Sequence, residues 1–257
     1  MKNVMTILLA LYSAVGFARV GAADGTTIHA AKQSAAHEVS ADRVESTKIH
    51  DLTATMQVND DETNIDELKR IGGAFATTYR ISHTVNVSYE YPNKARFEGR
   101  AFGVGISLIY NGDLKAYHTP IKSSSMNVAN QPGQKQSLLD LGIFAKDYLA
   151  TDWKPTFLRE ENGLDVFQLS LRAVGNNSKE IVWVNPKTMI TERRMSYNGD
   201  PKLIKELRYL KPMQIRPGIW VPTRIEIYNQ FGKLGAVQDI LNIKVNLGVD
   251  ESLFDAS

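Results

Sequence analysis

Side chains in residues 75–91 alternate with a period of two, and this alternation constrains the fold more than any other feature of the chain. The segment reads FATTYRISHTVNVSYEY, with seven of its nine odd-numbered positions apolar or aromatic, against one of its eight even-numbered positions. This pattern is typical of a β-strand with one apolar face, and a period of 3.6 does not fit it. A strand of this length would span about 55 Å at about 3.3 Å per residue. We therefore expect it to bend within a sheet that curves around an apolar interior.

The first 23 residues have the pattern of an export signal. Lys2 precedes an apolar stretch at residues 4–18, and small residues follow at positions 20–23. The stretch is shorter than the roughly 20 residues of a membrane span, although an uncleaved membrane anchor is the alternative interpretation. There is no cysteine to carry a lipid. We expect export to the periplasm without lipidation.

Composition excludes several classes of function. The absence of cysteine excludes disulfides, thiolate catalysis and cysteine metal sites. Without Lys2 and Arg19, the 30 basic residues fall to 28 and equal the 28 acidic ones. A neutral chain without a basic stripe argues against nucleic acid or an anionic membrane surface as a partner. About 235 mature residues are enough for one hydrophobic core.

The segment before the alternating region is expected to contribute little to the core. Residues 24–63 contain no aromatic residue and are predicted to be flexible, with a short helix suggested by Ile49, Leu52 and Met56. A second short helix is predicted at residues 65–71, with Asn64 as its N-cap and Gly72 at its end. The main domain is expected to span residues 64–257.

After residue 75, strand patterns and hairpin turns dominate. Alternation recurs at residues 94–100, 105–110, 167–172 and 237–247. Turns are predicted at residues 110–113, 161–163, 185–188, 197–200 and 230–233. In the last strand, Val237, Leu241, Ile243, Val245 and Leu247 are expected to share the apolar face. These features predict an antiparallel meander.

One region interrupts the strands. Residues 119–136 are polar and read as a long loop, whereas residues 137–149 place apolar side chains at helical spacing. We expect this helix to cover the concave face of the sheet. The predicted fold is therefore α+β, an incomplete, open antiparallel β-barrel whose strongly curved sheet is covered by a helical lid.

The chain offers no recognisable catalytic or metal site. The five histidines, at positions 29, 37, 50, 83 and 118, form no metal-binding pair, and no nucleophile elbow or dinucleotide fingerprint is present. His83 is expected to be a core histidine on the apolar face of the first strand. We predict a protein that is not an enzyme and uses no cofactor.

Apolar and aromatic side chains are abundant instead. An open barrel can enclose a cavity, and a mostly apolar cavity suits an acyl chain because each buried methylene contributes about 0.8 kcal/mol. Strand parity and helical spacing select the expected lipid-binding residues, which are Phe97, Leu108, Tyr110, Phe144, Tyr148, Phe167, Leu169, Ile225 and Ile227.

Two segments carry a family resemblance: residues 91–99 read YPNKARFEG and residues 107–117 read SLIYNGDLKAY. Together with residues 71–73, 181–184, 242–246 and 252–254, they resemble the LolA-like periplasmic lipoprotein carriers and the broader group of outer-membrane lipoprotein-sorting proteins. The resemblance implies an incomplete barrel, a helical lid and a cavity for lipoprotein acyl chains. The best-known carriers have an arginine before the Pro-Asn pair, implicated in lipid hand-off, but this chain has Tyr91 there. The resemblance therefore supports the fold more than the hand-off role.

Three functions remain open. The leading hypothesis is a soluble, monomeric periplasmic carrier of lipid or lipoprotein acyl chains. The second is an interaction module with a filled core that docks on an envelope export machine or an outer-membrane protein. The third is a hydrolase acting on an envelope lipid or glycan.

Overall fold

The computed structural model describes residues 48–129, 131, 134–145, 149, 152–172, 178–199 and 202–255. The expected export signal and the rest of the segment up to residue 47 lie outside these residues.

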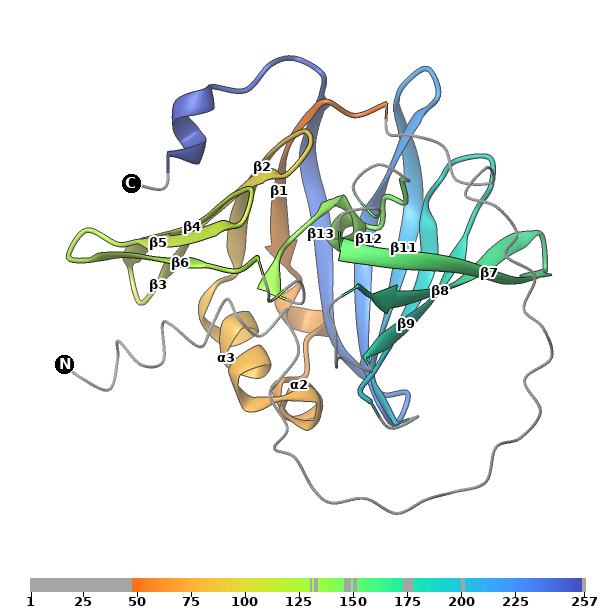
Figure 1. The fold of residues 1–257 in the computed structure, drawn as a ribbon. Helices are drawn as coiled ribbons and strands as arrows, with labels where there is room; N and C mark the ends of the chain where they lie inside the picture. Colours follow the sequence, from red (N-terminus) through yellow and green to blue (C-terminus); the bar gives the residue numbers. More distant parts are fainter. Residues whose placement is uncertain are drawn as a thin grey trace.

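A single antiparallel sheet of 13 strands dominates the fold (Figure 1). Its spatial order is β6-β5-β4-β3-β2-β1-β13-β12-β11-β10-β9-β8-β7. The strands are β1 (Asp51–Val58), β2 (Thr84–Glu90), β3 (Lys94–Ala101), β4 (Val104–Asn111), β5 (Leu114–His118), β6 (Ser123–Asn127), β7 (Trp153–Glu161), β8 (Leu164–Leu171), β9 (Lys179–Val184), β10 (Thr191–Tyr197), β11 (Leu203–Arg216), β12 (Ile219–Asn229) and β13 (Leu234–Val245). The sheet is curved but not closed, which confirms the predicted open barrel.

The order of the strands forces one connection across the open side of the barrel. The chain leaves the sheet at the edge strand β6 and returns at β7, the opposite edge. Residues 128–152, here called the crossover segment, must therefore span the mouth between them. Its described part includes a short 3-10 helix, η5 (Leu138–Leu141), whose three leucines are buried.

The prediction of a helix at residues 137–149 is wrong at residues 137–145, where only Leu138–Leu141 form a helical turn, whereas Leu149 is helical and its backbone amide donates to Ala145 O. Ser137 and Asp140 form a capping box at the start of η5, but Gly142 ends the turn with a left-handed φ of 78°. A Cβ at Gly142 would lie 2.5 Å from Cδ1 of Tyr209, so the backbone must approach that ring closely. The apolar residues that suggested a long helix, Leu138 and Leu141 among them, are instead buried in this short turn. The preceding region is also not only loop, because it contains β6.

The prediction of one long strand at residues 75–91 is wrong for its first half. Gly73–Ile81 form α-helix α3, and only Thr84–Glu90 form a strand, β2. Phe75 and Tyr79 are four residues apart, a spacing that fits both a helix and an alternating strand. His83 follows α3 and is exposed rather than in the core, with Nδ1 2.8 Å from Asp60 Oδ1. Asp60 belongs to a second 3-10 helix, η3 (Asp60–Glu62).

Helix α2 (Ile65–Ile71) is as predicted. The Asn64 side chain accepts hydrogen bonds from the backbone amides of Asp66 and Glu67, and Gly72 ends the helix. Leu68 is fully buried and lies against β13, where a Cβ at Gly235 would be 2.8 Å from Leu68 Cδ2. Helices α2 and α3 lie side by side at one end of the sheet (Figure 1).

The short helix predicted around Leu52 is also wrong. These residues form β1, which pairs with β2 on one side and β13 on the other. Leu52, Ala54 and Val58 are buried. The sheet thus includes residues before position 64. At the other end of the chain, a third 3-10 helix, η6 (Glu251–Phe254), packs beside β3 and β4.

Most hairpin turns are confirmed by the strand register. Residues 111 and 114 pair across the β4–β5 turn, and residues 161 and 164 pair across the β7–β8 turn. In β13, however, a bulge opposite Thr53 and Thr55 adds one residue, and Asn242 has a left-handed φ of 54°. Ile240 and Val245 are buried, but Leu241 is 41% exposed. The predicted apolar face of this strand is therefore wrong at Leu241, and Leu247 is exposed beyond its end.

Candidate functional site

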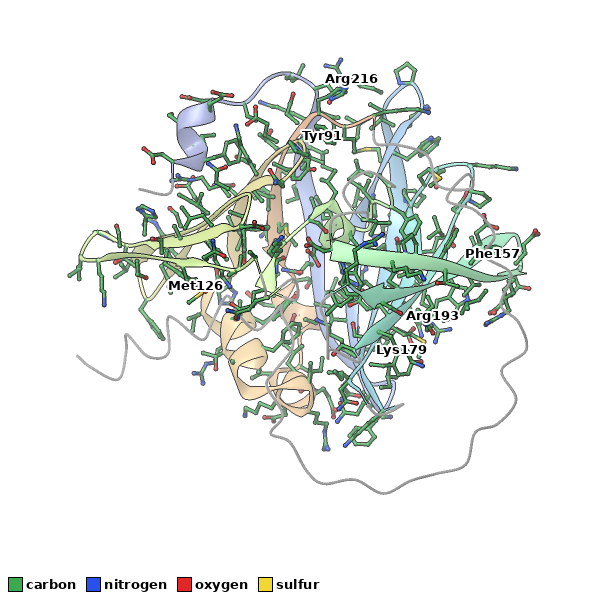
Figure 2. All side chains as sticks on the ribbon, viewed as in Figure 1. Tyr91, Met126, Phe157, Lys179, Arg193 and Arg216 are labelled. Carbon is green, nitrogen blue, oxygen red and sulfur yellow. The ribbon has the colours of Figure 1, made fainter. Side chains whose placement is uncertain are left out.

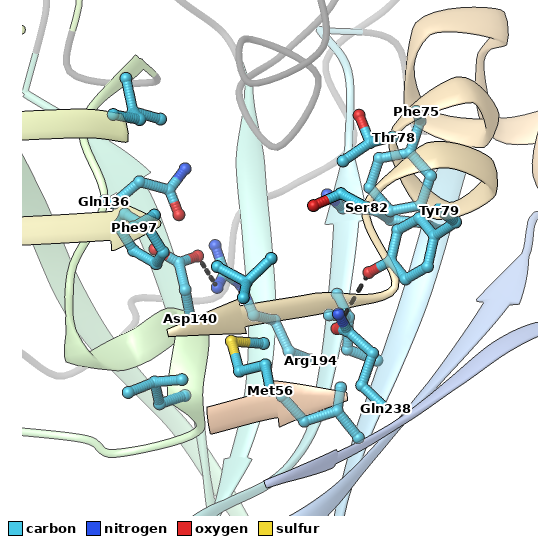
Figure 3. A pocket seen from close by; sticks show the side chains of 16 residues that line it. Met56, Phe75, Thr78, Tyr79, Ser82, Phe97, Gln136, Asp140, Arg194 and Gln238 are labelled. Atoms are coloured by element: carbon cyan, nitrogen blue, oxygen red, sulfur yellow. Dashed lines mark hydrogen bonds and ion pairs between the residues drawn. The ribbon is translucent and has the colours of Figure 1, made fainter. Parts of the chain in front are cut away.

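A cavity of about 110 Å³ lies between the concave face of the sheet and the elements that cover it (Figure 3). The sheet contributes Met56, Val85, Phe97, Leu108, Arg194, Lys205, Leu207, Ile225 and Gln238. The covering side chains come from α3, its C-cap and the crossover segment. Since one water molecule needs about 10–15 Å³ on this measure, the cavity holds roughly seven to eleven water-sized groups.

Helix α3 forms one wall of the cavity. Phe75, Thr78, Tyr79 and the C-cap residue Ser82 project toward it from successive turns. The hydroxyl of Tyr79 donates a hydrogen bond of 3.0 Å to Gln238 Oε1 on β13, which ties this wall to the sheet. Burial raises the pKa of Tyr79 well above its usual range, so the hydroxyl remains a donor.

The crossover segment forms the facing wall through Gln136, Asp140 and Leu141 (Figure 3). Its position is fixed by backbone hydrogen bonds to the β9–β10 region: Phe144 N donates to Met189 O, and Thr191 N donates to Gly142 O. Elsewhere in the segment, the Lys135 ammonium lies 2.8 Å from Asp113 and 3.0 Å from Asp152.

Arg194 is the central charged residue of the site. Its side chain is almost fully buried, and Nε and Nη2 donate to the two carboxylate oxygens of Glu180 at 2.5 and 2.9 Å. Nη1 donates to Asp140 Oδ1 at 2.9 Å, and Ser196 Oγ donates to Glu180 at 3.2 Å. Burial alone would lower the pKa of Arg194, but the acidic neighbours, Glu180 foremost, raise it. The guanidinium is thus a fixed cation held between two carboxylates.

Lys205 is the second cation of the cavity and lies over an aromatic ring rather than beside a carboxylate. Its Nζ lies 5.1 Å from the centre of the Phe75 ring. Its side chain makes no hydrogen bond or ion pair with any residue that the structure describes. Burial, together with the nearby charge of Arg194, lowers the pKa of Lys205 to about 8.

Three of the predicted lipid-binding residues, Phe97, Leu108 and Ile225, lie in the cavity wall. Tyr110 instead lines a second, smaller cavity of about 30 Å³, which shares Gln136 with the first. The hydroxyl of Tyr110 is buried there and has no hydrogen-bond partner among the described residues. Tyr148 lies outside the described residues.

The other predicted side chains fill the core rather than line the cavity. Phe144, Phe167, Leu169 and Ile227 are buried in the main hydrophobic cluster, and the rings of Phe144 and Phe167 lie 5.1 Å apart. The register places one row across the sheet on the concave side, in the order Phe157, Phe167, Val182, Arg194, Leu207, Ile227 and Ala236. The crossover segment covers this row at Phe144.

Tyr91 stands where the best-known carriers have the arginine implicated in lipid hand-off. It lies at the end of β2, away from α2 and α3 (Figure 2). It is 38% exposed, and its ring meets His50 edge-on at 6.1 Å. The nearby Arg96 does not replace a free arginine there, because its guanidinium contacts Leu253 O and Glu98.

Sequence reasoning missed the residues of α3 and both cations of the cavity. Phe75, Thr78, Tyr79 and Ser82 are spaced by three, one and three residues, which is a helical signal that the competing alternation concealed. Arg194 lies on the inward face of β10, but its side chain is charged and the two residues before it, Glu192 and Arg193, are charged as well. The sequence alone therefore does not predict that the Arg194 side chain is buried.

Within the described part of the chain, no three His, Asp or Glu side chains gather in a way that could hold a metal ion. Nor does that part contain a helix of the length and apolarity needed to cross a membrane.

Comparison with solved structures identifies the fold. An outer membrane lipoprotein-sorting protein domain from Vibrio parahaemolyticus superposes with a TM-score of 0.55 at 14% identity, covering 82% of this chain and 91% of the other. A LolA superfamily protein from Nitrosomonas europaea gives a TM-score of 0.53 at 16% identity, covering 84% and 94%. No curated protein sequence matches the chain.

A family model matches residues 116–257, which is more than half of the chain, and its description reads "Uncharacterized protein". The chain therefore belongs to that family, and its fold is that of the LolA-like lipoprotein-sorting proteins.

Proposed function

We propose that this protein is a periplasmic carrier that holds a lipid or lipoprotein acyl chain in the cavity under α3 and the crossover segment. The observation that carries the proposal is the cavity itself, which lies on the concave face of an open barrel and is walled mainly by apolar side chains. Each methylene buried there would contribute about 0.8 kcal/mol, so an acyl chain needs no covalent attachment to be held.

The size of the cavity implies that the covering elements move when a long chain enters. Sites for drug-sized ligands have volumes of about 300–1,000 Å³, which exceeds the 110 Å³ of this cavity. Two side-chain contacts hold the walls in place, Tyr79 to Gln238 and Asp140 to Arg194. We infer that the structure represents a closed form and that loading separates at least one wall from the sheet.

Native mass spectrometry of protein purified from its own envelope fraction, with organic extraction of the same sample, tests the proposal. We expect a bound lipid or lipopeptide at one copy per chain. A clean apo mass, together with no binding of a fluorescent acyl probe, would contradict it. That result would favour the alternative of an interaction module with a filled core.

Two tryptophan variants make the test specific to the cavity. Val85→Trp places a large side chain into the wall, and we expect it to weaken binding of the acyl probe at least tenfold. Leu241→Trp is the matched control, because Leu241 is exposed outside the cavity on β13. Equal binding by both variants would place the acyl chain elsewhere. Circular dichroism checks that each variant is folded.

Location is tested separately. We propose that residues 1–23 direct export to the periplasm and are then removed. N-terminal sequencing of the purified protein is expected to begin near Asp24, whereas an intact Met1 would indicate an uncleaved segment.

A further inference from the structure

The cavity contains a cation, Lys205, that makes no direct hydrogen bond or ion pair with any described residue, although Glu180 and Asp140 attract it at longer range. Lys205 extends from β11 into a mainly apolar space, where its ammonium lies over the Phe75 ring. Lys205 is partly buried, and an ammonium that has lost part of its hydration is unfavourable unless it is paired. An unpaired lysine in a ligand cavity is therefore informative about the ligand.

The other charged groups around the cavity do not supply this pairing. Both oxygens of the Glu180 carboxylate accept hydrogen bonds from Arg194. Asp140 accepts one hydrogen bond from Arg194 and another from the backbone amide of Ser137. Both carboxylates are thus hydrogen-bonded to Arg194 and act on Lys205 only at longer range. No described carboxylate lies within ion-pair distance of the Lys205 ammonium, so its N–H donors have no direct anionic partner.

We infer that the physiological occupant is an amphiphile whose acidic group, a carboxylate or a phosphate, pairs with Lys205 while its chain lies against the apolar wall. This inference rests on the proposed carrier function and narrows it to anionic lipids. Apolar side chains lie beside the ammonium, since Phe75 and Leu207 line the same cavity as Lys205. A neutral chain would leave the ammonium unpaired and cover it as well.

The pKa of Lys205, about 8, gives the inference a second readout. An anion beside the ammonium favours its charged form. At pH 8 Lys205 is about half protonated, so binding of an anion is expected to take up roughly half a proton per ligand. Arg194, Glu180 and Asp140 also face this position, and Arg194 is hydrogen-bonded to both carboxylates.

The test compares three ligands that share a twelve-carbon chain: dodecanoate, dodecyl phosphate and 1-dodecanol. Their affinities are measured by calorimetry for the wild type and for Lys205→Met, which keeps most of the length of the side chain but removes its charge. Lys244→Met serves as the control, because Lys244 is an exposed residue of β13 outside the cavity. Repeating the titrations at pH 8 in buffers of different ionisation enthalpy gives the proton uptake.

We expect the wild type and Lys244→Met to bind at least one anion tenfold or more tightly than 1-dodecanol, since hydrogen bonds to charged groups are the strong ones. The two anions together identify whether a carboxylate or a phosphate is preferred. In Lys205→Met this preference should fall below threefold and the proton uptake should disappear.

Failure of the inference differs from failure of the proposed function. If all three ligands bind the wild type equally and without proton uptake, the acidic-headgroup inference is wrong but the acyl cavity stands. An anion preference that persists in Lys205→Met also overturns the inference. If none of the ligands binds the wild type, both the carrier function and the inference are wrong.

Discussion

Arg194 and Asp140 join the sheet to the segment that closes its mouth. Nη1 of Arg194, on β10, donates a 2.9 Å hydrogen bond to Oδ1 of Asp140, which belongs to η5 in the crossover segment. The Nε and Nη2 donors of the guanidinium hold Glu180 on β9. Because Asp140 also caps η5 through Ser137, one carboxylate stabilises both the turn and its attachment to the sheet.

Removing this carboxylate should loosen the crossover segment while the sheet remains folded. Asp140→Ala deletes one charge-assisted hydrogen bond and one cap, a loss of about 2–4 kcal/mol. We expect amide hydrogen exchange at Gly142, Phe144 and Thr191 to accelerate by up to roughly 30–700-fold, since a change of 1.4 kcal/mol is about tenfold. Exchange in β12 should change little.

Asp61→Ala is the control for this prediction, because Asp61 is an exposed acid in η3. It should leave exchange in the crossover segment as in the wild type. Uniform acceleration across the sheet in Asp140→Ala would mean that the contact supports the whole fold rather than a separable cover.

Lys205 and Lys115 should make the protein more stable as the pH rises from 8 to 9.5. Burial lowers the pKa of both lysines to about 8, from an ordinary value of 10.5. In this range the unfolded chain binds more protons than the folded one, so the free energy of unfolding increases with pH. Each lysine should contribute about 1–2 kcal/mol of this rise.

Urea unfolding at several pH values checks the sign. Lys205→Met should remove about half of the rise, and Lys244→Met should preserve it. Above about pH 10 the trend should reverse, because burial raises the pKa of Tyr79 and Tyr209 and the unfolded chain loses those protons first. A stability that falls steadily from pH 8 would contradict the assignment.

The extent to which the sequence predicts this fold depends on how local each signal is. The cap at Asn64 and the turn at Gly163 act within a few residues, and both are confirmed. Phe75 and Tyr79 satisfy two periods at once, so local pattern alone could not separate α3 from a strand. What decides between them is burial against β13, through the contact of Tyr79 with Gln238.

The candidate site was harder to predict than the fold because it depends on which strands are neighbours. Strand parity selects Phe97, Leu108 and Ile225 and also selects Phe167 and Leu169, yet only the first three reach the cavity. The crossover segment separates the two groups by covering part of the concave face. Its path follows from β6 and β7 being opposite edges, which no local pattern reveals.

The bulge in β13 gives a direct test of the strand's observed register. Ile240 is buried and Leu241 is exposed, the reverse of the alternation expected from the sequence. Ile240→Ser should reduce the free energy of unfolding by about 3 kcal/mol or more, since it removes buried apolar area and adds a polar group. Leu241→Ser should change it by less than about 0.5 kcal/mol. The opposite order, measured by urea unfolding, would show that the bulge is misplaced.

Gly142 should be the glycine least tolerant of substitution. Its φ is 78°, and a Cβ would lie 2.5 Å from Tyr209 Cδ1 and 3.1 Å from Pro222 Cγ. Gly142→Ala therefore combines backbone strain with overpacking, and we expect a loss of about 2–4 kcal/mol in the free energy of unfolding. Gly105→Ala is the matched control, because a Cβ there meets no atom within 4 Å and the backbone is not left-handed. Thermal unfolding should show a lower Tm for Gly142→Ala alone. Similar Tm values for the two variants would mean that the crossover segment can move away from Tyr209 without cost, and that the contact does not hold the cavity closed.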